Sequence, residues 1–128
     1  MAKKLDGAGT VKMSLLHDAG IAMQRIHSIV EQMAMAAKNQ QSTAVQGMQL
    51  RRMATPLVGQ LKGAFGPMSD QLAQMILVAT RGGQENVKVR MLRESVGSLR
   101  TQIDIAMNKV KEHHTVDDEE EKGSNPAA

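Results

Sequence analysis

Cysteine, tryptophan and tyrosine are missing from this 128-residue chain, and Phe65 is its only aromatic residue. A chain without cysteine forms neither a disulfide nor a thiolate metal site, which is typical of proteins from a reducing compartment. Its core has to be built from methionine and aliphatic side chains, which suit the narrow seams between helices. The length corresponds to one domain.

Long apolar runs are also missing. The unbroken apolar stretches, such as residues 75–79, are far shorter than the roughly 20 residues of a membrane-spanning helix. Lys3 and Lys4 stand near the start, but they are not followed by the apolar segment of a signal peptide. We therefore expect a cytoplasmic protein without a membrane span.

Acidic residues are scarce in most of the chain and concentrated at its end. Residues 1–116 hold fifteen Lys or Arg against eight Asp or Glu, whereas residues 117–128 hold five acids and one Lys. Because neighbouring like charges repel, we expect a disordered acidic tail at 115–128, beside a folded part at 10–114 and a flexible N-terminus at 1–9. The tail either keeps the protein soluble or competes for a basic face.

Apolar residues recur at alternating intervals of three and four near both ends of the folded part. One stripe runs from Leu16 to Ala37 and the other from Val89 to Val110. This heptad spacing, with the breaks between the apolar segments, predicts helices at 10–39, 42–65, 67–81 and 85–114. Short connections make successive helices fold back on each other. The predicted fold is all-α, an elongated antiparallel bundle of three to four helices with coiled-coil-like heptad seams.

Several residues predict where these helices begin and end. Thr10 is the expected N-cap of the first helix, Asn39 closes it, and Ser42 caps the next one. Pro56 and Pro67 are each tolerated only at a helix start or a kink, because proline lacks the N–H that bonds the preceding turn. The second proline follows a glycine and is the stronger predicted break.

The heptad stripes carry the main functional hypothesis. A stripe does not reveal whether it packs on the same chain, on a second copy or on another protein. Ile21 and Met35 are apolar residues on the otherwise polar side of the first helix and favour docking. We expect a non-enzymatic helical interaction protein, an oligomerising adaptor or assembly module that binds itself or a protein partner. Its predicted interaction seam consists of Leu16, Met23, Ile26, Val30, Met33, Leu92, Val96, Leu99, Ile103 and Val110.

The excess of basic residues supports an alternative function, sequence-nonspecific nucleic-acid binding regulated by the acidic tail. Lysine and arginine can neutralise phosphates without reading bases. The scarcity of aromatic rings argues against stacking on single strands. The candidate polyanion contacts are Arg51, Arg52, Lys88, Arg90, Arg93 and Arg100.

The histidines are the remaining candidates for a catalytic or metal-binding role. The stretch LLHDAGIAMQRI places His17 beside Asp18 and resembles the phosphoacceptor helix of two-component histidine kinases, although Gly20 stands three residues after the histidine rather than four. The resemblance implies a phosphotransfer module with His17 as acceptor. A solvated polar pair is the favoured interpretation. His113 and His114 do not share a helix face, so we expect no metal site, and the sequence predicts no catalytic residue or cofactor.

Overall fold

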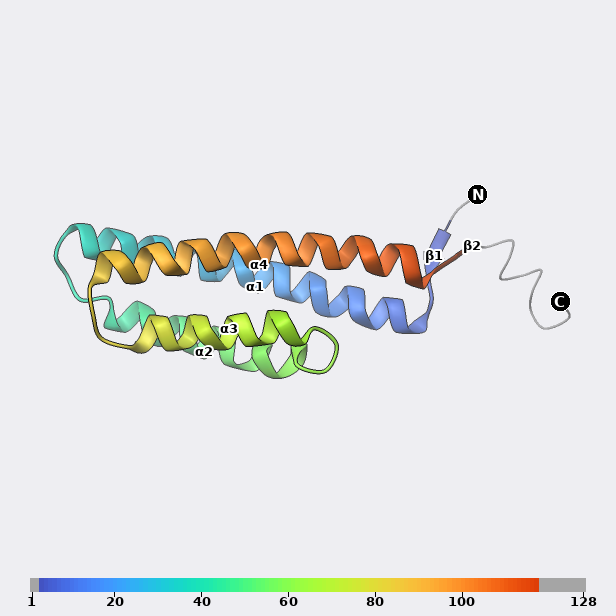
Figure 1. Ribbon diagram of the computed structural model, residues 1–128, viewed down its shortest axis with the longest axis horizontal. Coiled ribbons are helices and arrows are strands. Elements are labelled where there is room, and N and C mark those ends of the chain that lie inside the picture. Colours follow the sequence, from blue (N-terminus) through green and yellow to red (C-terminus); the bar gives the residue numbers. More distant parts are fainter. Residues whose placement is uncertain (1–2, 118–128) are drawn as a thin grey trace, which may run out of the picture.

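The computed structural model describes residues 3–117, which form four helices and one short pair of strands (Figure 1). Helix α1 spans Gly7–Lys38, α2 Ala44–Leu61, α3 Gly66–Thr80 and α4 Glu85–His114. Strands β1 (Lys3–Leu5) and β2 (Thr115–Asp117) pair in antiparallel register. The predicted helical bundle is confirmed, and the two-stranded ribbon adds to it.

The helices pack as two pairs of unequal length. Helix α1 lies along α4, α2 lies along α3, and the two pairs form two layers (Figure 1). Helices α1 and α4 have 32 and 30 residues, whereas α2 and α3 have 18 and 15. At about 1.5 Å per residue, the long pair therefore extends roughly 20 Å beyond the short pair. This excess lies at the end where α2 turns into α3.

The two heptad stripes face into one core. All residues of the predicted seam are buried, from Leu16 at 0 % exposed to Val110 at 4 %. They belong to a continuous cluster with Leu50, Leu72 and Met75 of the short helices. Complete burial of one such side chain contributes about 1.5–3 kcal/mol to stability. Each stripe thus packs against other helices of the same chain.

The start of the chain differs from the expected flexible segment. Residues 3–9 form β1 and the first turn of α1. The N-cap is Asp6 rather than Thr10, and its carboxylate accepts a hydrogen bond from the Gly9 backbone N–H at 2.6 Å. Aspartate caps helices at least as well as threonine. Its place is set by β1, whose partner strand lies at the other end of the sequence, so the local pattern does not predict it.

The end of the chain also differs from the expectation where it is described. Thr115–Asp117 form β2, although we expected the tail to begin at residue 115. Residues 118–128, which carry the rest of the predicted acidic tail, lie outside the described residues.

The other helix boundaries follow the sequence closely. Asn39 is the C-cap of α1, as expected. Thr43 precedes α2 as its N-cap, while the Ser42 hydroxyl accepts from the Ala44 N–H at 3.2 Å. Pro67 lies in the first turn of α3, which confirms the predicted break. Pro56 lies inside α2, where it removes one helical hydrogen bond.

The surface of α1 agrees with its sequence pattern. Ile21 and Met35 are exposed, at 42 % and 60 %.

Among residues 3–117, none of the helices combines the length and the apolar character needed to cross a membrane.

Candidate functional site

The unequal length of the two helix pairs creates a step. Helix α2 ends at Leu61 and α3 begins at Gly66, and beyond this turn the long pair α1–α4 continues without a second layer (Figure 1). A groove of about 380 Å³ opens where the turn meets the uncovered length of α4. We call it the step groove. Its lining residues are Lys12, Ala64, Phe65, Pro67, Met68, Gln102, Ile105, Ala106, Lys109, Val110, His113 and His114.

The floor of the step groove is apolar. The side chain of Ile105 is 50 % exposed and lines the groove. Phe65, the single aromatic residue of the chain, is half-buried in the wall formed by the turn. Met68 and Val110 are buried and close the groove towards the core. Apolar walls with a few polar groups at the edge are typical of binding sites.

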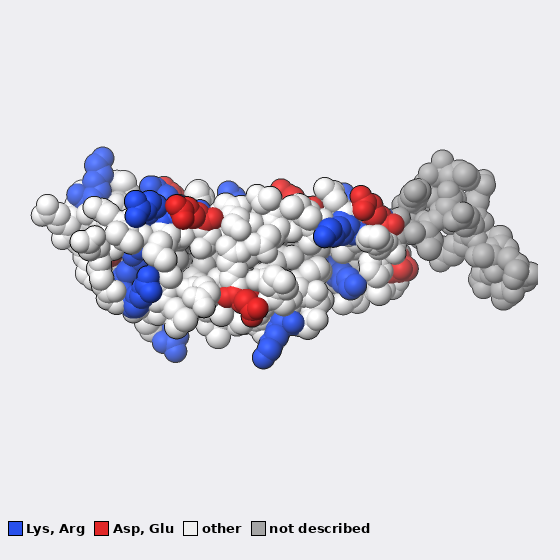
Figure 2. Space-filling view, in the orientation of Figure 1, with Lys and Arg blue, Asp and Glu red and all other residues white. Residues whose placement is uncertain are grey.

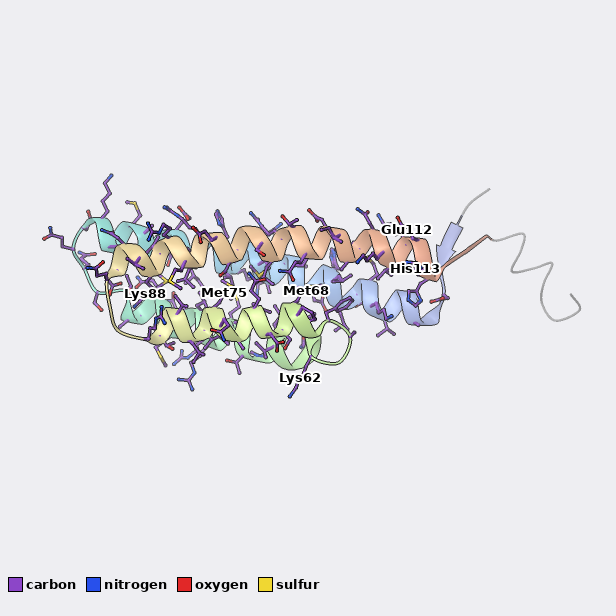
Figure 3. The ribbon with its side chains drawn as sticks, in the orientation of Figure 1. Lys62, Met68, Met75, Lys88, Glu112 and His113 are labelled. Carbon is purple, nitrogen blue, oxygen red and sulfur yellow. The ribbon has the colours of Figure 1, made fainter. Side chains whose placement is uncertain are left out.

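The rim of the step groove is basic. Lys12 comes from α1, and Lys109, His113 and His114 come from the last turns of α4. In Figure 3, His113 lies on the side of α4 that faces the step, and Glu112 lies on the opposite side. None of the described lining residues is acidic. The groove therefore combines apolar surface with two lysines that attract anions.

Hydrogen bonds hold one end of this rim in place. Lys12 Nζ lies 3.1 Å from His114 Nε2, and His114 Nδ1 lies 3.3 Å from the Asp6 carboxylate. An ammonium group has only donors, so Nε2 accepts from Lys12 and Nδ1 carries the proton that faces Asp6. The pKa of Asp6 is lowered, chiefly by the backbone N–H of Gly9 and further by His114 and Lys12. This chain of contacts joins the start of α1 to the end of α4.

The predicted polyanion contacts are divided between α2 and α4. Arg51 and Arg52 are exposed on α2, whereas Arg90, Arg93 and Arg100 are exposed on α4. Figure 2 shows Lys and Arg side chains dispersed over the visible face, with Asp and Glu side chains near several of them.

Lys88 has to be removed from the polyanion set, because its side chain is only 7 % exposed. It lies at the end of the bundle away from the step, and Figure 3 shows it between the two layers. Its Nζ donates to Thr43 Oγ1 at 3.4 Å and lies 3.7 Å from a Glu85 carboxylate oxygen. The Thr43 hydroxyl in turn donates to Glu85. The sequence pattern suggests an exposed Lys88. Its burial depends on partners that are distant in the sequence, which the local pattern does not reveal.

Arg93 also forms an ion pair with another residue of the same chain. Its guanidinium donates two hydrogen bonds to the Glu31 carboxylate, at 2.9 and 2.7 Å. This bidentate pair bridges α4 and α1 on the outer face of the long pair. Its hydrogen bonds lower the pKa of Glu31 and raise the pKa of Arg93. A phosphate would have to compete with Glu31 for this arginine.

The fold places both residues of the phosphotransfer hypothesis on the surface. His17 and Asp18 are both exposed on α1, as the solvated-pair interpretation expects. His17 borders a shallow groove with Ile21, Arg100 and Asp104. The residues that the structure describes contain no group of three or more His, Cys, Asp or Glu that could hold a metal ion.

Sequence reasoning missed the step groove. Val110 was expected as part of the interaction seam, and Phe65 was not expected to line a site. The available signal was the difference in helix length, since the predicted helices at 10–39 and 85–114 were already much longer than the one at 67–81. Ile105, an apolar residue off the heptad stripe, was a second signal.

The fold and the groove define a two-layered helical bundle with an open apolar step. No family model, curated protein or solved structure matches the chain.

Proposed function

We propose that the chain is a non-enzymatic helical interaction module that takes an amphipathic helix of a partner protein into the step groove. The observation that carries the proposal is the apolar groove of about 380 Å³ at the point where the second helix layer stops. A helix laid there would continue the layer of α2 and α3 and would cover the half-exposed side chain of Ile105. Helix-in-groove recognition uses such surfaces, with apolar anchors at intervals of three and four.

The step groove replaces the heptad stripes as the proposed docking surface. Residues such as Met23 and Leu99 are 1 % exposed within a single chain. A partner could reach them only if the helices separated, which would expose the whole core. The step groove is accessible without any such change.

A second copy of this chain fits the groove less well than a different protein does. In a twofold dimer the same patch occurs on both sides, so Lys12 and Lys109 would face other basic groups.

The proposal is tested with a neutral amphipathic peptide of leucine, alanine and glutamine, titrated into isotope-labelled protein. We expect the amide shifts to concentrate at residues 64–68 and 102–114. Ile105→Asp should weaken binding about tenfold or more, since it removes an apolar anchor. Leu77→Asp is the matched control, because Leu77 is 59 % exposed on α3 and does not line the groove.

Two results would contradict this function. One is a set of shifts spread over the outer faces of α1 and α4. The other is an equal loss of binding in the Ile105→Asp and Leu77→Asp variants.

A further inference from the structure

Both long helices contribute basic side chains to the lining of the step groove. Lys12 stands on α1 and Lys109 on α4, with Ile105 and Ala106 also in the lining. An apolar segment that fills the groove therefore passes basic groups contributed by both long helices. The chemistry of the segment's flanks then decides whether these groups attract or repel it.

Lys12 is positioned before any partner arrives. Its Nζ is held by His114 at 3.1 Å, and His114 is held by Asp6 at 3.3 Å. Ordering a long side chain at an interface costs free energy, and that cost falls when the side chain is already fixed. The ammonium still has donors left after its bond to one acceptor. A carboxylate from a partner can accept one of them.

We infer that the partner helix of the step groove is acidic, with Glu or Asp on the flanks of its apolar stripe. This inference rests on the proposed function and names the chemistry of its partner. Carboxylates on the two flanks meet Lys12 and Lys109, while the apolar stripe covers Ile105. A basic amphipathic helix of equal apolar content is rejected, because its flanks meet like charges.

Two other occupants have weaker support. The chain's own acidic residues 118–121 follow β2, whose first residue comes directly after the groove residue His114. They carry charge but no apolar side chain for the floor of the groove. A second copy brings apolar surface but the wrong sign of charge.

The experiment compares three fluorescent peptides of about 16 residues, which span roughly 24 Å as helices. All carry the same leucine stripe, flanked by Glu, by Gln or by Lys. Binding to the full chain is measured by fluorescence anisotropy. We expect the Glu peptide to bind about tenfold or more tightly than the Lys peptide at about 50 mM salt, with a smaller ratio at about 200 mM.

A pair of charge reversals locates the effect. Lys109→Glu should weaken binding of the Glu peptide about three- to tenfold and strengthen binding of the Lys peptide. Lys62→Glu makes the same change in net charge at an exposed site after α2 that does not line the groove (Figure 3). It should change either affinity by less than about twofold.

The possible failures separate the two proposals. Equal affinity for all three peptides overturns the acidic preference and leaves the helix-docking function standing. Absence of binding by all three overturns both. If Asp118→Asn, Glu119→Gln, Glu120→Gln and Glu121→Gln together raise affinity for the Glu peptide tenfold, the groove belongs to the chain's own tail. A mass of two chains by light scattering, returned to one by Ile105→Asp, assigns it to a second copy. Either result overturns the inference.

Discussion

Gly47 of α2 lies directly against the backbone carbonyl of Ala79 near the end of α3. A Cβ atom at position 47 would overlap the Ala79 carbonyl oxygen and touch its carbonyl carbon. The close approach of the two short helices at this point depends on the missing side chain, because backbone atoms cannot move aside as a flexible side chain can.

Gly47→Ala should therefore destabilise the protein by about 1–3 kcal/mol, which is the usual cost of overpacking. Denaturant unfolding followed by circular dichroism measures the change. The matched control is Gly59→Ala in the same helix, where a Cβ would have none of the described atoms within 4 Å. There alanine should stabilise by about 0.5–1 kcal/mol, since glycine is the poorer helix former. Equal effects of the two substitutions would show that the helices are not in close contact at Gly47.

Pro56→Ala should stabilise the protein, because Pro56 lies inside α2 and removes a helical hydrogen bond there. Pro67→Ala should be neutral or destabilise by up to about 1 kcal/mol, because Pro67 lies in the first turn of α3, where its fixed φ suits the helix start. Thermal unfolding of both variants measures the contrast. A larger gain at Pro67 than at Pro56 would contradict the assigned helix boundaries.

The polar cluster of Thr43, Glu85 and Lys88 gives a prediction of a different kind. Thr43→Val removes a hydroxyl that both donates to Glu85 and accepts from Lys88, in a position only 1 % exposed. Leaving these partners unsatisfied should cost about 1–3 kcal/mol. Lys88→Met keeps the buried stem and removes the charge, so it should cost less or even stabilise. Urea unfolding compares the two variants, and a greater loss for Lys88→Met would mean that the charge itself supports the fold.

The ion pair of Glu31 and Arg93 should make stability depend on pH. Its hydrogen bonds lower the pKa of Glu31 below the ordinary value of 4.5, so the pair contributes fully above about pH 4.5. The contribution is lost as pH falls through the lowered pKa and Glu31 takes up a proton. The difference in unfolding free energy between the original protein and Glu31→Gln should therefore be larger at pH 7 than at pH 3. Both side chains are about half exposed, so added salt should also reduce it.

A double-mutant cycle with Arg93→Gln isolates this pair. The coupling energy should be favourable at pH 7 and smaller at pH 3. A coupling that is unchanged between the two pH values would contradict the assignment of the effect to the Glu31 carboxylate.

The parts of this fold that the sequence predicts are those set by local periodicity. The stripe from Leu16 to Ala37 predicts the first long helix within a few residues, and the Gly66–Pro67 pair predicts the break between α2 and α3. Partners far apart in sequence are not predictable in this way. Lys88 donates a hydrogen bond to Thr43, which lies 45 residues earlier in the sequence, and its side chain is buried. The basic residues near Lys88 in the sequence predict an exposed side chain instead.

The same limit applies to the candidate site. The heptad residues were expected to form an interaction seam because a stripe shows only that a face is covered, not what covers it. The step groove depends on where α2 and α3 stop relative to α4, and this relation involves the packing of three helices at once. The sequence predicts that the first and last helices are longer than the third. It does not predict that the uncovered length lies at the end where α2 turns into α3.

The ribbon of β1 and β2 also brings the first and last described residues together. Lys3 lies opposite Asp117 across the two strands. The two ends of the described chain, Lys3 and Asp117, therefore lie next to each other. Such a unit can be inserted into a surface loop of a host protein without forcing the flanking host segments apart. By the same geometry, a short linker across residues 3 and 117 would allow a circular permutant with new ends in the connection between α3 and α4.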